Sequence, residues 1–113
     1  MPTMMLRTSA NVAQVDALLA ELSTLLAKSL GKPERYVLVS VDQGPMRMAG
    51  SAAPAAFADV RSIGGLDGPA CARVSGALAA VLERTLAIPP DRVYLNFTDV
   101  AADRWGWNGA TFA

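Results

Sequence analysis

Pro2 is the residue whose type and position most directly suggest chemistry in this chain. If Met1 is removed, as is usual before a small second residue, the chain begins with a prolyl secondary amine. Burial against apolar neighbours lowers the pKa of such an amine, because desolvation disfavours the charged form. The chain contains no histidine, so proton transfer near neutral pH needs another base, and a free amine is suitable. The alternative is that Pro2 only follows the start residue.

Length and composition favour one soluble domain that associates with copies of itself. The chain has 113 residues, and 52% of them are hydrophobic, which for a small domain indicates apolar surface buried between subunits. Its ten basic and ten acidic residues balance, so we expect no nucleic-acid partner and no membrane partner. No apolar run is long enough to span a bilayer, and the N-terminus lacks a signal-peptide pattern. We expect a cytoplasmic protein, and the sequence leaves open whether it is exported without a signal peptide.

The first half of the chain is predicted to be a strand, a helix and a second strand. Residues 3–8 read as a strand, apolar enough to be buried on both faces of a sheet. Leucine and valine residues at helical spacing predict a helix over 12–30, with an N-cap among residues 9–11. Gly31 suits a left-handed helix end, and Pro33 cannot continue the helix. Residues 36–41 are predicted to form the second strand.

The second half repeats this order. Residues 57–63 and 92–98 are predicted strands, and the helix between them starts at Asp67 and carries its apolar stripe to Leu86. A short edge strand over 46–48 is expected between the halves. The resulting halves, about 2–43 and 57–99, are followed by an aromatic tail in a single domain covering residues 1–113.

Two tandem βαβ units predict an α/β (α+β) fold with a four-stranded mixed sheet. Right-handed crossovers place both helices on one face of that sheet. The predicted strands lack a polar face, so the bare sheet face needs a cover. Other copies of the chain are the simplest cover.

Five motifs follow one another along the chain: the Met1-Pro2 start, Gly31-Lys32-Pro33, Ser62-Ile63-Gly64, Pro90 through Asn96, and the ending Gly106 through Ala113. Together they make the chain similar to the macrophage migration inhibitory factor family of the tautomerase superfamily. The resemblance implies a homotrimer whose sheets surround a central channel, with sites at the subunit interfaces. It also implies keto–enol tautomerase activity on small aromatic keto or enol acids such as phenylpyruvate-like and dopachrome-like compounds, with no metal or organic cofactor.

The resemblance implies three site residues from one subunit. Pro2 matches the catalytic base, and Lys32 matches the cation that holds the substrate's carboxylate or polarises its oxygen. Ile63 matches a position whose backbone N–H meets the substrate oxygen. Without the resemblance, Lys32 reads as a charge near a helix C-terminus and Ile63 as strand packing.

Further matches supply the other side and the walls of the site. Tyr94 and Asn96, two apart on one strand face, would reach into the neighbouring subunit's pocket. Trp107 and Phe112 match apolar walls of the pocket. Trp105 stands where a smaller aliphatic residue is common, so it would narrow the mouth or add a stacking surface. Without the resemblance, Tyr94 reads as a core aromatic and Asn96 as a polar residue at a strand end. Trp107 and Phe112 then read as ordinary packing of the tail.

Two other functions remain as alternatives. The chain could be a trimeric cytokine-like interaction or signalling protein whose pocket is vestigial. It could instead catalyse a hydration or dehalogenation, which needs an arginine and a carboxylate that activates water. Arg104 and Asp103 lie near the tail, but nothing in their spacing requires that role. Thiol–disulfide activity is not expected, because Ala55 and Ala58 stand where some relatives carry a Cys-x-x-Cys pair. Cys71, the only cysteine, excludes an intrachain disulfide and a cysteine-based zinc cluster.

Overall fold

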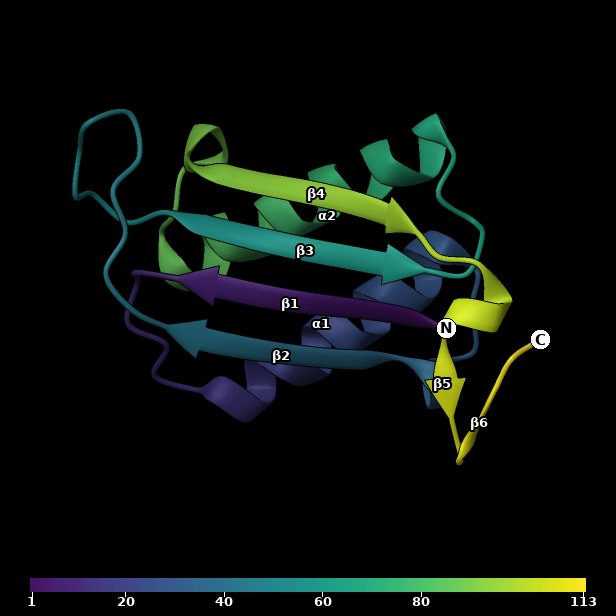
Figure 1. Ribbon diagram of the computed structural model, residues 1–113. Coiled ribbons are helices and arrows are strands. Elements are labelled where there is room, and N and C mark those ends of the chain that lie inside the picture. The colour runs from purple at the N-terminus through teal and green to yellow at the C-terminus, as the bar shows by residue number, and fades with distance from the viewer.

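The computed structural model describes residues 1–113 as one four-stranded sheet with two helices on one face (Figure 1). The strand order is β2 (Leu38–Gln43), β1 (Pro2–Thr8), β3 (Ala56–Ser62), β4 (Val93–Asp99). β1 is parallel to β2 and antiparallel to β3, and β3 is parallel to β4. Helix α1 (Val15–Leu30) joins β1 to β2, and α2 (Gly68–Leu86) joins β3 to β4. The predicted mixed sheet with both helices on one face is confirmed.

The core lies between the two helices and the sheet face that they cover. Every second side chain of β1 and β3 points into it, as the alternation of a strand requires. Each large apolar side chain buried in this way stabilises the fold by about 2 kcal/mol. The fully buried members include Met4, Leu6, Val60, Leu22, Leu26, Leu78 and Leu82.

The open face of the sheet carries charges, which corrects the prediction that the strands lack a polar face. Met5, predicted to be buried, is 41% exposed on this face. Arg61 and Asp59 form an ion pair there at 3.1 Å, and Arg7 is also exposed. The period of two places these residues opposite the helices, and an apolar type such as methionine does not reveal which face it occupies. Other large apolar side chains exposed in the sheet are Leu38, Phe57 and Tyr94.

Helix α1 begins later than predicted, at Val15, and none of residues 9–11 caps it. The nearby hydroxyls are used elsewhere. The Thr8 hydroxyl donates to the carbonyl oxygen of Ala55 at 2.8 Å, and the Ser9 hydroxyl accepts from the Ala55 N–H at 3.1 Å. These bonds fasten the chain after β1 to the segment before β3, so the polar cluster that resembles a helix cap is a tertiary clamp.

The connection between the halves has no strand over 46–48. Met48 forms only an isolated bridge with Ser51. The loop is instead held by Arg92, the last residue of the 3₁₀ turn η2 (Pro90–Arg92). The Arg92 guanidinium donates at 2.9–3.1 Å to four carbonyl oxygens, those of Met48, Ser51, Ala53 and Pro54.

Short elements complete the chain. The 3₁₀ turn η1 (Glu34–Tyr36) delays β2 to Leu38, two residues later than predicted. After β4 come η3 (Ala102–Arg104) and a hairpin of β5 (Gly106–Trp107) and β6 (Ala110–Thr111). Its turn residues Asn108 and Gly109 have φ of 53° and 78°, the backbone that favours an Asn-Gly pair between two strands.

The helix ends follow the predicted chemistry. The Asp67 carboxylate accepts from the Ala70 N–H at 2.9 Å at the start of α2. Gly31 ends α1 with φ of 63°, and α2 ends in the same left-handed conformation at Ala87, with φ of 56°. Neither helix combines the length and apolar character that crossing a membrane requires.

Replacing Ala87 by glycine should stabilise the protein, because a β-carbon is unfavourable at positive φ. We expect Ala87→Gly to raise the free energy of unfolding by about 0.5–1 kcal/mol, the relief of strain less the greater entropy of the unfolded chain. Urea denaturation at one fixed protein concentration measures the change. In the control Ala80→Gly, inside α2, the same substitution should lower stability by about 1 kcal/mol. Equal effects at both positions would contradict this account.

Candidate active site

The directions of the strands bring most of the predicted site residues to one end of the sheet. β1 starts at this end, α1 returns to it, and β3 and β4 finish there, with Pro2 opposite Ser62 in the β1–β3 register. In Figure 1 the N-terminus lies beside β5 and the short yellow turn η3 that follows β4. The start of the chain, the end of α1 and the tail therefore meet at one corner.

Lys32 and Ile63 are in contact at this corner. Lys32 Nζ donates a hydrogen bond to the carbonyl oxygen of Ile63 at 3.0 Å. Lys32 also acts on the N-terminal amine of Met1. Burial lowers the pKa of this amine, and the positive charge of Lys32 lowers it further. The corner thus favours a neutral amine beside a fixed cation.

Three aromatic rings form a wall next to the amine. Trp107 and Phe112 stack with ring centres 5.5 Å apart and planes 13° apart. Tyr36 meets both rings edge-on, at 6.0 Å from Trp107 and 6.5 Å from Phe112. Such edge-on and offset arrangements are favourable for aromatic groups. The three rings therefore support one another, although Tyr36 comes from the turn before β2 and the other two come from the tail.

A hollow of about 310 Å³ lies against this wall. This volume is at the small end of the usual range for ligand sites, roughly 300–1,000 Å³. Trp105 lines it and also lines a second hollow of about 280 Å³ beside Arg61 and Arg104. The first hollow is lined by Met1, Thr3, Arg35, Tyr36, Val37, Leu38, Trp105, Gly106, Trp107 and Phe112.

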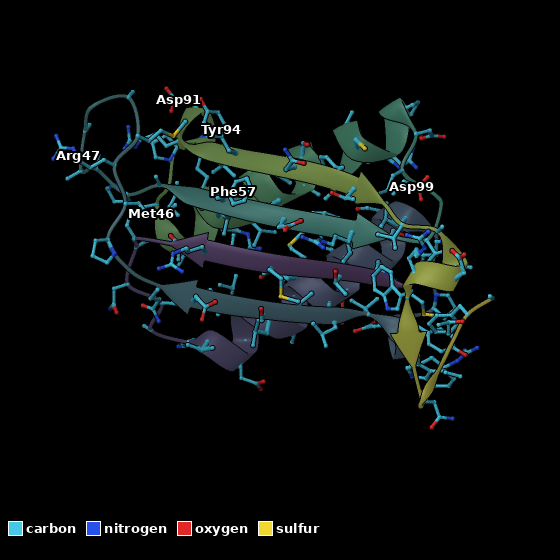
Figure 2. All side chains as sticks on the ribbon, in the orientation of Figure 1. Met46, Arg47, Phe57, Asp91, Tyr94 and Asp99 are labelled. Atoms are coloured by element: carbon cyan, nitrogen blue, oxygen red, sulfur yellow. The ribbon has the colours of Figure 1, made fainter.

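Tyr94 and Asn96 are not part of this corner. Both are exposed on the open face of β4, where Tyr94 pairs with Phe57 while Asp99 lies opposite Ser62. Figure 2 shows Tyr94 and Phe57 toward the end with Met46 and Arg47, away from Asp99. At ~3.3 Å per residue, Tyr94 is roughly 16 Å along the strand from the Asp99 position. Within one chain these two side chains do not meet Pro2.

The sequence did not identify Arg35 and Tyr36 as site residues. The sequence pattern predicts Tyr36 at the start of a strand, whereas η1 directs it toward the tail. The repeated Pro-acid-Arg pattern of residues 33–35 and 90–92 was the available signal, because both copies fold as a 3₁₀ turn before a strand. Recognition of that turn would have kept Tyr36 at the corner with Lys32.

Other chemically active groups lie apart from this arrangement. Asp103 and Arg104 face each other at 3.8 Å, and both side chains are exposed. No group of three or more aspartate, glutamate, histidine or cysteine residues is placed to hold a metal ion. A larger hollow of about 440 Å³ lies between the start of α1 and the end of α2, beside the Arg84–Glu21 ion pair, and contains none of the predicted site residues.

Comparison with known proteins extends the family resemblance of the motifs to the whole chain. The family described as "Macrophage migration inhibitory factor (MIF)" matches residues 1–113. The macrophage migration inhibitory factor of Meriones unguiculatus is 40% identical, with 100% of both chains covered. The crystal structure of a homologue from Prochlorococcus marinus superimposes with a TM-score of 0.94 at 43% identity, covering 98% of this chain and 99% of that one. The protein from Toxoplasma gondii gives 0.91 at 38% identity, covering 96% and 98%.

The fold and its corner define a small α+β protein with a ligand-sized hollow beside its N-terminal amine. The family match and the identity over full length show more. This chain belongs to the macrophage migration inhibitory factor family.

Removing the charge of Lys32 should raise the pKa of the N-terminal amine, because a nearby cation disfavours the protonated form. In Lys32→Gln we expect the midpoint, followed by NMR of the N-terminal residue, to move to higher pH. The matched control is Lys28→Gln, an exposed lysine of α1, which should leave the midpoint in place. A midpoint that stays or falls in Lys32→Gln would show that Lys32 does not act on the amine.

Proposed function

We propose that this protein is a cofactor-independent keto–enol tautomerase of phenylpyruvate-like and dopachrome-like compounds. The proposal assigns the role of base to the amine of Pro2, which is released when Met1 is removed. The observation that carries it is the corner around Pro2: Pro2 is buried, and the amine of the preceding Met1, whose pKa is lowered by burial and by the charge of Lys32, lies at the edge of an aromatic hollow. Family membership supports it, because the resemblance implies this activity.

In the proposed reaction the neutral Pro2 amine removes the proton from the enol hydroxyl. The electron pair of that O–H bond forms the carbonyl, and the enol double bond takes a proton from the resulting ammonium at carbon. The amine is thereby regenerated, and no other reactant is consumed. The Lys32 ammonium stabilises the negative oxygen or holds the carboxylate, and the Ile63 N–H assists at the oxygen.

The walls of the hollow have two roles in this proposal. Trp105, Trp107 and Phe112 stack against the aromatic ring of the substrate and orient it. They also exclude water from the amine, which keeps the amine unprotonated near neutral pH. The base is then in its active form without histidine.

The proposal includes a homotrimer in which the neighbouring subunit completes each site. The support is the division of the site residues between the two ends of the sheet, together with exposed apolar side chains on the open face, Met5, Leu38, Phe57 and Tyr94. A neighbour shifted along the sheet would bring its Tyr94 and Asn96 to the Pro2 corner. Each interface would hold one site.

Pro2→Ala should lower kcat/KM for the enol of phenylpyruvate by about a hundredfold or more, because it replaces the secondary amine that acts as general base. Intact mass must first show that Met1 is absent from the wild type. The wild-type rate should rise with pH through a midpoint below the ordinary α-amino range, since only the neutral amine accepts a proton and the buried position of Pro2 disfavours its charged form.

The control for Pro2→Ala is an unchanged molecular mass of the assembly. Wild-type turnover by a correctly processed Pro2→Ala would rule out the amine mechanism. If the wild type is correctly processed and turns over no enol, the alternative of an interaction protein with a vestigial pocket stands.

A mixing experiment tests the shared site. Pro2→Ala and the double variant Tyr94→Ala/Asn96→Ala should each be poorly active alone. When the two are unfolded and refolded together in equal amounts, about one quarter of the interfaces combine an intact Pro2 with an intact neighbour. Activity should rise toward that fraction of the wild-type value. No gain over the separately refolded variants would show that the two halves do not act in one site.

A further inference from the structure

Arg35 is a cation at the aromatic hollow that has no acidic partner in the protein. It lines the hollow together with Tyr36 and the aromatic tail. The ion pairs of the structure involve Arg61, Arg84 and Arg104, and Arg35 takes part in none of them. A guanidinium is always charged near neutral pH, so the hollow contains a fixed positive charge.

The surroundings hold the Arg35 side chain without neutralising it. Its guanidinium carbon lies 4.7 Å from the centre of the Tyr36 ring, a cation–π contact that fixes position and leaves the N–H groups free. Tyr36 is itself held edge-on by Trp107 and Phe112. The arginine is therefore supported by the same rings that would stack on a substrate.

The nearest acid in the sequence is directed elsewhere. The Glu34 carboxylate accepts a hydrogen bond from the Ser23 hydroxyl of α1 at 2.9 Å. No aspartate or glutamate lines the hollow. Its ionisable groups are Arg35, which is charged, and the amine of Met1, whose pKa is lowered by burial and by the charge of Lys32. An anion would be attracted here, and nothing in the wall would repel it.

Arg35 lines the hollow, Lys32 acts on the amine at its edge, and aromatic rings form its wall. We infer that the preferred substrates are aromatic α-keto or enol acids with a second anionic group on the side of the ring remote from the keto acid. This inference rests on the proposed function and assigns the two charges to different ends of the ligand. Lys32 and the Pro2 amine act at the keto acid, and Arg35 binds the remote anion. Guanidinium groups are well suited to a carboxylate because they donate two parallel hydrogen bonds.

The experiment compares the enol of phenylpyruvate with its analogue that carries a carboxylate para to the side chain. The readout is the ratio of kcat/KM for the two substrates. In Arg35→Gln the preference for the carboxylated substrate should fall about fivefold, the size expected for a partly exposed charge pair. The kcat/KM of plain phenylpyruvate should fall less than that of the carboxylated substrate, because plain phenylpyruvate has no remote anion for Arg35 to bind. The control Lys28→Gln removes an exposed cation outside the hollow and should leave the ratio unchanged.

A binding measurement separates this inference from the proposed reaction. Calorimetry with cinnamate and para-carboxycinnamate, which do not tautomerise, should show the same Arg35-dependent preference. If no enol is turned over while this preference is present, the proposed function fails and the anion site stands. If Arg35→Gln changes neither the kinetic ratio nor the binding ratio, Arg35 does not bind the remote group and the inference is wrong. An equal loss of the preference in Lys28→Gln would also overturn it, since the net charge of the protein, and not the position of Arg35, would then explain the preference.

Discussion

The antiparallel pairing of β1 with β3 is the constraint on which the rest of the molecule depends. It joins the two βαβ units in register from Pro2–Ser62 to Thr8–Ala56. Because the two strands run in opposite directions, the start of β1 lies beside the end of β3. The N-terminal amine is thereby placed next to the residue that follows Ser62, which is Ile63. A shift of one residue between the strands would turn the buried side chains of one of them to the open face and separate these groups.

The same directions decide which residues share a corner. α1 runs back against β1, so Lys32 returns to the end where the chain began, and the tail that follows β4 returns there too. Tyr94 lies at the start of β4 and so belongs to the opposite end. The division of the predicted site residues between two ends is therefore a consequence of topology. No rearrangement of one chain that preserves the sheet would bring them together.

The order of elements was predictable because each has a strong local signal. Helical leucine spacing, the Asp67 cap and the Gly31 end are all found in the structure. The open face was mispredicted because Met5 and the Arg61–Asp59 pair depend on which face the helices cover. The start of α1 was missed because the polar residues that resemble a cap bond to Ala55, far away in the sequence. The contact of Tyr36 with the tail likewise depends on tertiary packing between distant segments. Local pattern predicts elements better than it predicts such contacts.

The mixture of side chains on the open face agrees better with contact between subunits than with a missing internal layer. A buried core would not accept Arg7, which takes part in no ion pair of the structure, since burying an unpaired charge is costly. An interface tolerates such groups beside apolar anchors, because its rim remains wet. Phe57 and Tyr94 are adjacent on this face and exposed, and aromatic residues in such positions often contribute strongly to association. If the neighbour is shifted along the sheet, these anchors meet the aromatic corner of the next copy. The contact that completes the site would then also stabilise the assembly, and loss of Tyr94 would weaken both.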